Sequence, residues 1–434
     1  MMRVLKCLLI ATVAANPAQA QLRLPVAPLP PLPVQKLTQT VGQTGAAALD
    51  QLSEIRHLEI ARLLRANPRS IEADPHGNPI VRDELLALSP TAQAMDSAQA
   101  RGFKIVREQR LGELGFHLAV LQPPPRMSIA KALRQLRQAD PAGTYDYNHI
   151  YMGVGTAVEG LSRSPIQKGT AASDEASSAA QALPSVGLVD SGVDVSHPAF
   201  RDAIIHTWGC GEHLFASTHG TAVASLLVGQ AMPFHGVLDK AELYAADVYC
   251  NAPTGGAVDA MAAAFAWLTQ QRIAVINVSL VGPDNAALAQ IVRALTTRGF
   301  LLVAAVGNDG PAAAPLYPAS YPHVVGVTAV DARRRVLIEA ARGNQVMFAA
   351  PGADMAAADM GGKYAAVRGT SFAAPIVAAL LAQTLIAPDP GNSNAAVESL
   401  AQRAIDLGPR GRDLTYGFGL VGADYRIDPA DLRR

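Results

Sequence analysis

Three short segments in the second half of the chain carry side chains that together could perform nucleophilic catalysis. Asp190 ends an apolar run, His219 precedes a run of small residues, and Ser371 begins an apolar stretch. Separately, they would be read as a turn residue, a buried histidine and a helix cap. A serine hydroxyl, however, needs a base to take its proton, and histidine titrates in the right range. A carboxylate can orient that histidine, so the combination indicates acyl-transfer chemistry.

The order and spacing of these residues resemble those of the subtilisin-like serine proteases, the subtilases or peptidase family S8. The order is Asp, His, Ser, with a gap of 29 residues followed by a gap of 152. The resemblance covers roughly residues 183–425. It includes the motifs Asp190-Ser191-Gly192, His197-Pro198, His219-Gly220-Thr221, Ala305-Val306-Gly307-Asn308, Tyr317-Pro318-Ala319, Tyr321-Pro322, Ala350-Pro351-Gly352, Gly369-Thr370-Ser371 and Tyr416-Gly417-Phe418-Gly419.

The resemblance implies a role for each reacting group. Ser371 would attack the peptide carbonyl, His219 would act as general base and then acid, and Asp190 would orient His219. Asn308 resembles the family's oxyanion-hole asparagine and would act with the backbone N–H of Ser371. Outside this context, Asn308 would be read as a turn residue in a Gly-rich loop.

The resemblance also implies a set of substrate-binding residues. An extended wall would pair with the substrate backbone as an added strand. Two small residues would help to line the pocket for the residue before the cut, although a plain buried sheet explains them equally well. The wall and pocket residues are Ser279, Leu280, Val281, Gly282, Ala304 and Ala305.

Four positions depart from the family pattern. Ala222 stands where a second histidine is usual, and Phe372 replaces the usual methionine after the serine. Val281 replaces a glycine and would narrow the cleft, while Arg368 would place a charge near it. None of these changes removes a reacting group, so they bear on specificity and rate rather than on reaction class.

The elements that must position these residues are predicted from the pattern of residues 183–434. Short apolar runs alternate there with Ala-rich, helix-like stretches, which is typical of a parallel sheet covered on both faces. The apolar runs are residues 186–189, 274–280, 301–306 and 324–330. We therefore expect an α/β fold with a mostly parallel central sheet, and the resemblance implies that it is a subtilisin-like three-layer sandwich.

The first half predicts a smaller α+β domain over residues 78–150. Strands are expected at 79–88, 103–109, 115–121 and 144–150, with helices after Ser89 and Ser128. This β-α-β-β-α-β order is ferredoxin-like. Subtilases commonly carry such a domain as a propeptide, which implies an intramolecular inhibitor and autocleavage in or before residues 151–181. The alternative is a permanent N-terminal interaction domain.

The remaining segments predict export and connection. A basic start, a short apolar run and Ala18-Gln19-Ala20 read as a signal peptide over residues 1–20. Residues 21–77 form a Pro-rich leader followed by a helix at 49–66, and residues 151–182 read as a flexible linker. Cys210 and Cys250 could pair in an exported protein, but the sequence cannot show that their Cα atoms are close enough.

Composition narrows the possible functions. The 434 residues include 36 basic and 36 acidic side chains, and 50% of residues are hydrophobic against 17% charged. Disorder throughout is excluded, and zero net charge gives no pull toward nucleic acid. No apolar run is long enough for a membrane anchor. We expect no cofactor, because no acidic loop has a convincing calcium-ligand spacing, although structural calcium stays open.

The sequence therefore predicts an exported serine endopeptidase, periplasmic or extracellular, that acts on polypeptides and is made as an autoprocessed zymogen. The alternative is a secreted subtilase-fold protein that binds peptides with weak or no catalysis. An α/β-hydrolase esterase is disfavoured because no Gly-x-Ser-x-Gly elbow is present. A metalloprotease is disfavoured because the chain lacks His-Glu-x-x-His.

Overall fold

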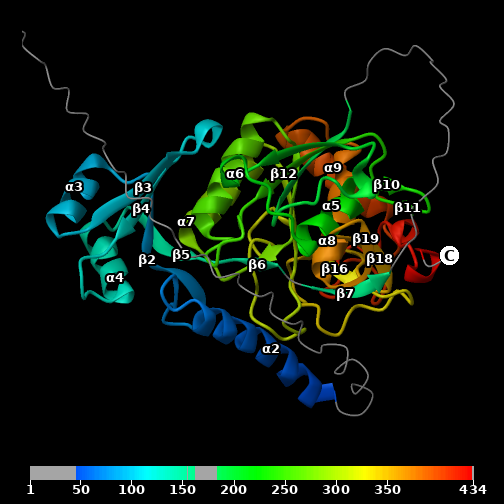
Figure 1. The fold of residues 1–434 in the computed structure, drawn as a ribbon, viewed down its shortest axis with the longest axis horizontal. Helices are drawn as coiled ribbons and strands as arrows, with labels where there is room; N and C mark the ends of the chain where they lie inside the picture. Colours follow the sequence, from blue (N-terminus) through cyan, green and yellow to red (C-terminus); the bar gives the residue numbers. More distant parts are fainter. Residues whose placement is uncertain (1–44, 154, 162–182, 433–434) are drawn as a thin grey trace, which may run out of the picture. The chain divides into compact units, whose positions relative to one another are not determined.

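Seven parallel strands form the central sheet of residues 183–432, hereafter the C-terminal region (Figure 1). The computed structural model describes residues 45–153, 155–161 and 183–432. Every neighbouring pair in this sheet is parallel. In spatial order the strands are β17 (Val346–Pro351), β16 (Val325–Val330), β15 (Leu301–Ala305), β13 (Val275–Val278), β8 (Ser185–Asp190), β12 (Glu242–Asp247) and β9 (Ile204–Trp208).

Helices cover both faces of this sheet, because its strands are apolar on both sides. Along β15, Leu301, Val303 and Ala305 enter one core, whereas Leu302 and Ala304 enter the other. This alternation follows from the two-residue period of a strand. The first core is covered by α5 (Thr218–Val228), α8 (Thr370–Ala382) and α9 (Pro390–Arg403), and the second by α6 (Val258–Gln270) and α7 (Ala286–Thr297).

Smaller sheets flank the central one. β18 (Met355–Asp359), β19 (Lys363–Arg368) and β7 (Thr156–Leu161) form an antiparallel sheet that leads into α8. β14 (Leu280–Val281) pairs with β6 (Met152–Gly153). A short hairpin joins β10 (Gln230–Ala231) to β11 (Phe234–His235).

A second, antiparallel sheet lies within residues 71–149, hereafter the N-terminal region. Its main strands are ordered β5–β2–β4–β3. β1 pairs with the first three residues of β2, whereas β4 pairs with the last four. The elements are β1 (Ile71–Ala73), β2 (Pro79–Leu88), α3 (Ala92–Ala100), β3 (Lys104–Arg110), β4 (His117–Gln122), α4 (Ile129–Ala139) and β5 (Thr144–His149). From β2 onward, their order is the one that the sequence predicts.

Two local expectations need correction. Ser89 was expected to cap α3, but the cap is Thr91, whose hydroxyl accepts a hydrogen bond from the Ala94 N–H at 3.1 Å. The helix expected at residues 49–66 begins earlier, as α2 (Gly45–Ala66). The spacing of apolar residues predicted the helix, but it did not mark the first turns because they are small residues.

The predicted linker differs most from the structure. Residues 151–182 were expected to be a flexible connection, yet β6 and β7 fall within this range and pair with strands of the C-terminal region. The Ser- and Ala-rich stretch begins only at residue 161, where the second of these two short strands ends, and the partners of both strands are distant in sequence. Residues 162–182, the predicted signal peptide at 1–20 and the Pro-rich leader lie outside the described residues, and the domain boundaries stay predictions.

Candidate active site

Asp190 and His219 form a hydrogen-bonded pair at the carboxyl end of β8. The Nδ1 of His219 lies 2.7 Å from Oδ1 of Asp190, and the carboxylate is fully buried. The same oxygen accepts hydrogen bonds from the N–H and the hydroxyl of Ser191, at 2.7 and 3.0 Å. A carboxylate on Nδ1 fixes the tautomer, so that Nε2 is the nitrogen that can take up a proton.

Close contact between β8 and α5 makes this pair possible. Ser191 links the two elements, because its hydroxyl accepts a hydrogen bond from the Gly220 N–H at 3.1 Å. A Cβ on Gly220 would clash with the carbonyl oxygens of Ser191 and Gly192. Only glycine therefore lets the first turn of α5, which carries His219, approach the strand end this closely.

Ser371 lies in the first turn of α8 and is tied to the segment at residue 279. Its hydroxyl donates a hydrogen bond to the Ser279 carbonyl at 3.1 Å, and the Ser279 hydroxyl donates to the Ser371 carbonyl at 2.9 Å. Asn277 supports this arrangement by donating to the Ser279 hydroxyl at 3.0 Å. The candidate nucleophile is thus positioned by a helix end and by the residue that joins β13 to β14.

Asn308 is oriented by the residue next to the candidate nucleophile. The Thr370 N–H donates to Oδ1 of Asn308 at 3.1 Å. Because this contact uses the amide oxygen, the NH₂ group of Asn308 faces away from Thr370. The first turn of a helix directs backbone N–H groups outward, and Ser371 is the second residue of α8. The two predicted oxyanion donors thus come from adjoining segments.

Gly153 and Gly155 of the chain itself lie close to the candidate catalytic residues. A Cβ on Gly153 would lie 3.2 Å from both Cε1 and Nε2 of His219, and one on Gly155 would lie 2.7 Å from the ring of Phe372. The rings of His219 and Phe372 have centroids 5.7 Å apart. The backbone on either side of residue 154 therefore lies against His219 and against the residue that follows Ser371.

This stretch is held between two walls. On one side, β6 pairs antiparallel with β14, with Gly153 opposite Leu280 and Met152 opposite Val281. On the other, the Tyr151 N–H donates to the Gly256 carbonyl at 2.8 Å, and Ile150 forms a bridge with Ala257. The pairing is that of a peptide added to a strand edge.

The predicted substrate-binding residues separate into two groups. Ser279, Leu280 and Val281 lie along this groove, and a Cβ on Gly282 would press on the ring of Tyr151. Ala304 and Ala305 are instead fully buried and belong to the cores on opposite faces of the central sheet. The plain buried-sheet explanation accounts for both alanines, and their role in the pocket stays a prediction.

The structure shows the surroundings of three of the four departures from the family pattern. Arg368 is paired with the buried Glu339, with Nε–Oε1 at 2.7 Å and Nη2–Oε2 at 2.9 Å, so its charge is neutralised within the protein. Phe372 packs its ring beside His219. Ala222 is fully buried in the core.

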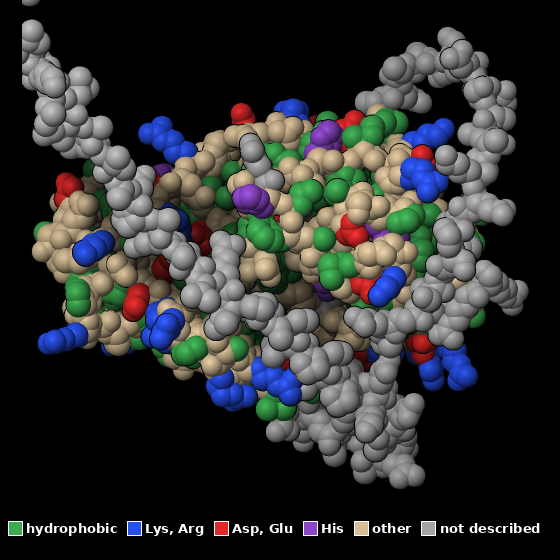
Figure 2. Space-filling model, in the orientation of Figure 1, with side chains coloured by type: hydrophobic (Ala, Val, Ile, Leu, Met, Phe, Trp, Pro, Cys, Tyr) green, Lys and Arg blue, Asp and Glu red, His purple; other side chains and the backbone are tan. Residues whose placement is uncertain are grey.

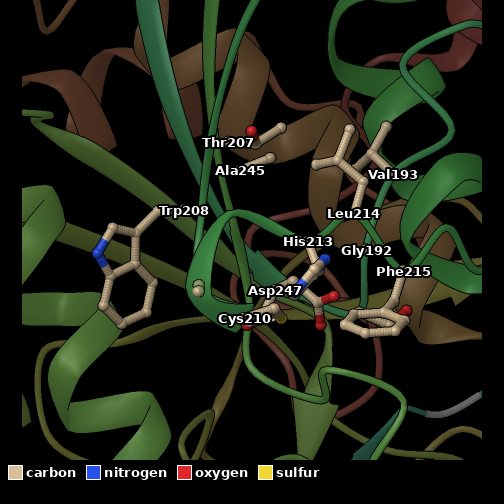
Figure 3. Close-up of a pocket in the computed structure, with 13 residues that line it drawn as sticks. Gly192, Val193, Thr207, Trp208, Cys210, His213, Leu214, Phe215, Ala245 and Asp247 are labelled. Carbon is tan, nitrogen blue, oxygen red and sulfur yellow. Dashed lines mark hydrogen bonds between the residues drawn. The ribbon is translucent and has the colours of Figure 1, made fainter. Parts of the chain in front are cut away.

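A separate pocket is lined by Ser191 and Gly192, the two residues that follow Asp190, among others (Figure 3). Figure 3 shows Asp247, Cys210 and His213 converging on one side of it, with Trp208 on the other. Burial, with a further contribution from the nearby Asp190, raises the pKa of Asp247 above its ordinary value. Cys210 and Cys250 form a disulfide there, with Cα atoms 5.1 Å apart.

The same corner brings potential metal-binding groups together in the described part of the chain. Cys210, Asp247 and Cys250 place one ligand atom each within 4.8 Å of the others. The two sulfurs are bonded to each other in the disulfide, so they are not thiolate ligands.

On the face of the molecule drawn in Figure 2, basic and acidic side chains are interspersed.

Three residues at the site were not singled out from the sequence. Ser191 and Thr370 lie inside the quoted motifs, so their positions beside Asp190 and Ser371 were available as signals. Tyr249 is different, because it follows β12 by two residues and belongs to no motif. Its hydroxyl contacts the backbone of both Tyr151 and Gly153.

Comparison with known proteins places the chain in a family. The sequence profile of the subtilase family matches residues 183–419. The minor extracellular protease Epr of Bacillus subtilis (strain 168) is 30% identical over 254 residues, covering 57% of this chain and 38% of that protein. Subtilisin E of the same strain is 31% identical over 246 residues, covering 54% and 63%. Subtilisin DY of Bacillus licheniformis is 30% identical over 247 residues, covering 55% and 89%.

The fold has a counterpart among solved structures. The crystal structure of fervidolysin from Fervidobacterium pennivorans, a keratinolytic enzyme related to subtilisin, matches with a TM-score of 0.61. The match has 20% sequence identity and covers 82% of this chain and 61% of that one, so it bears on the fold alone.

The chain therefore belongs to the subtilase family of serine-type endopeptidases, and the predicted subtilisin-like α/β fold is confirmed. It spans 38% of the length of Epr and 63% of that of subtilisin E. In the part of the chain that the structure describes, no helix is both long and apolar enough to span a bilayer.

Proposed function

We propose that this protein is an exported serine endopeptidase, made as a zymogen that cuts its own chain. The observation that carries the proposal is the hydrogen-bonded pair Asp190–His219 facing a strand of the same chain, β6, which occupies the groove beside β14. A module that only bound peptides would need the groove, but it would have no use for a tautomer-fixing carboxylate behind the histidine.

Each group has a role in the proposed reaction. His219 removes the proton from the Ser371 hydroxyl, which attacks the carbonyl carbon, and Asp190 stabilises the imidazolium that forms. The amide of Asn308 and the backbone N–H of Ser371 stabilise the negative charge on the tetrahedral oxygen. His219 then protonates the leaving amine, and water releases the acyl group by the same steps in reverse order.

The register of β6 indicates where the chain is cut. Gly153 lies against His219 and pairs with Leu280, while the carbonyl of the preceding Ser279 holds the Ser371 hydroxyl. Gly155 lies against Phe372 and the Arg368 carbonyl. We therefore propose that the maturation cut falls between Gly153 and Gly155, on one side of Val154. This narrows the interval of residues 151–181 expected from the sequence.

The N-terminal region has contacts suited to an intramolecular inhibitor. Asp146 accepts a hydrogen bond at 2.7 Å from the Ala286 N–H, which opens α7, and a carboxylate is favourable at a helix N-terminus. Asn148 bonds Asp259 in the first turn of α6. These contacts hold β5 in place, and β5 leads directly into the strand that fills the groove.

Export and the absence of a cofactor also stay proposals. Epr, a relative, is named an extracellular protease, which supports export of this chain. The mechanism uses the side chains and backbone named above and invokes no metal.

The proposed activity is tested by active-site labelling. The full chain and its Ser371→Ala variant are treated with a fluorophosphonate, and hydrolysis of unfolded casein is followed. We expect label on Ser371 and casein hydrolysis in the wild type, and neither in the variant. Ser399→Ala, an exposed serine on α9, is the matched control and should behave as wild type. A folded wild type that neither labels nor cuts would favour the peptide-binding alternative.

A further inference from the structure

The two walls of the groove hold the chain by different chemistry. β14 pairs backbone to backbone with β6. Across the groove, the phenolic hydroxyl of Tyr249 makes two hydrogen bonds to the same strand. It accepts one from the Gly153 N–H at 3.1 Å and donates one to the Tyr151 carbonyl at 2.8 Å. A single side-chain atom thus bridges two backbone groups that stand two residues apart.

A tyrosine hydroxyl can make both bonds at once, because it has one donor hydrogen and two acceptor lone pairs. Burial, together with the negative charge of Asp190, raises the pKa of Tyr249 above its ordinary value. The phenol therefore keeps its proton at neutral pH and can donate to the carbonyl. Phenylalanine would fill the same space and make neither bond.

The Tyr249 backbone is fixed independently of the strand in the groove. Oδ1 of Asp247 accepts hydrogen bonds from the N–H groups of Tyr249 and Cys250, at 2.9 and 3.0 Å. Cys250 is also bonded to Cys210, which Figure 3 shows beside Asp247. A Cβ on Gly255 would come within 2.5 Å of the Tyr249 Cα, so the loop passes this backbone closely. The ring is thus supported from β12 and from two loops.

We propose that Tyr249 is a positioning and specificity-determining residue that reads the backbone of the substrate. Its hydroxyl accepts a hydrogen bond from the N–H of the substrate residue that takes the place of Gly153. It donates a hydrogen bond to the carbonyl of the residue two positions earlier. The inference rests on the proposed function, in which residues 151–153 occupy the groove as a substrate does. It follows that peptides with an N-alkylated residue at that position, proline included, are poor substrates.

A double-mutant cycle between enzyme and peptide tests this directly. The enzyme is the self-processed product of the full chain, as wild type and as Tyr249→Phe. The peptides are residues 149–157 and the same peptide with N-methylglycine in place of Gly153, which replaces the amide hydrogen with a methyl group. In the wild type, we expect N-methylation to lower kcat/KM about tenfold, consistent with the loss of one hydrogen bond and some steric cost. In Tyr249→Phe, the parent peptide should be cut about tenfold more slowly, and N-methylation should cost about twofold or less.

Two controls separate recognition from folding. Tyr244→Phe removes a hydroxyl on β12 that bonds Glu242, and it should leave both peptides as in wild type. The ester p-nitrophenyl acetate carries no backbone N–H that could bond Tyr249, so it should be hydrolysed equally by wild type and Tyr249→Phe. An equal loss on ester and peptide, or unchanged discrimination in Tyr249→Phe, overturns the inference while leaving the proposed activity intact. Failure of the wild type on every substrate, without fluorophosphonate labelling, overturns the proposed function and this inference with it.

A second measurement needs no activity. In the full chain carrying Ser371→Ala, we expect Tyr249→Phe to speed hydrogen exchange of the Gly153 amide about tenfold. Tyr244→Phe should not change it. An unchanged Gly153 amide in Tyr249→Phe overturns the inference.

Discussion

The two sheets of this protein differ in how they are covered. The parallel sheet of the C-terminal region has its own helices on both faces. The N-terminal sheet has α3 and α4 on one face, in a separate core with Leu85 and Leu121. Its other face, with Leu86 and Leu118, belongs to the core of α6 and α7. The C-terminal region thus supplies both helix layers of its own sheet. One face of the N-terminal sheet is instead covered by helices of the C-terminal region.

The rim of this shared core is polar. Arg107 on β3 bonds both Glu84 and Asp259, at 2.6 and 2.8 Å, and so joins the two regions across α6. Such contacts are screened by salt and cost little to separate. We therefore propose that the C-terminal region holds the N-terminal region before processing and can release it afterwards.

The largest expected effect concerns the N-terminal region alone. Expressed with its flanking segments as residues 45–153, it exposes the apolar face that α6 and α7 cover in the full chain, and a domain this small cannot spare that burial. We expect circular dichroism to show a largely unfolded chain that gains structure when the processed C-terminal region is added. Cooperative thermal unfolding of the isolated fragment would contradict the comparison.

A second variant separates chemistry from binding. Asn308→Ala removes one oxyanion donor and should lower kcat on peptides about 10²- to 10³-fold. Because Asn308 belongs to the C-terminal region, affinity for the N-terminal region should stay unchanged. Single-turnover kinetics and a binding titration check the two halves of this prediction. A comparable loss in both would mean that the substitution disturbs the fold.

Acid should loosen the N-terminal region selectively. Burial alone would raise the pKa of Asp74, but hydrogen bonds from His149 and Asn78 outweigh it and lower the pKa to about 2. The ionised carboxylate therefore stabilises the folded state above its ordinary pKa, and this contribution is lost as the pH falls from about 4 to 2. The expected loss is about 2 kcal/mol.

The measurement for this prediction is urea unfolding of the full chain between pH 5 and 2. Every protein in this experiment also carries the Ser371→Ala substitution, which prevents autolysis. Asp74→Asn should lack the acid-dependent loss and should be less stable than its parent at pH 7. Identical pH profiles in the two proteins would refute the assignment to Asp74.

The smallest effect is expected at the polar rim. Arg107 is about half exposed, so its ion pairs contribute about 1 kcal/mol or less at low salt. Arg107→Ala should weaken retention of the N-terminal region a few-fold after processing, and the difference should vanish in 1 M salt. Arg110→Ala, an exposed arginine on the same strand, is the control. A salt-independent loss would point to packing instead of charge.

The sequence predicted the parts of the site that depend on short motifs. Asp190, His219, Asn308 and Ser371 each stand in a segment where small residues permit close approach, as at Gly220. The order of the six elements from β2 to β5 followed from periodicity and from residues typical of helix ends, although Thr91 and not Ser89 caps α3. The roles of these site residues stay predictions until activity is measured.

Long-range pairings could not be predicted. Residues 151–153 look like the start of a linker, and their strand character comes from β14, more than a hundred residues later. The pairing of Arg368 with Glu339 and the position of Tyr249 likewise depend on tertiary contacts. The sequence also could not distinguish an alanine in a pocket from one in a core, as at Ala304.

The central claim is that this chain occupies its own active site and is its first substrate. Intact-mass and N-terminal sequence analysis of residues 21–434, as wild type and as Ser371→Ala, tests it most directly. We predict a new N-terminus at Val154 or Gly155 in the wild type and an uncut chain in Ser371→Ala. A cut outside Gly153–Gly155, or the same cut in Ser371→Ala, would contradict it.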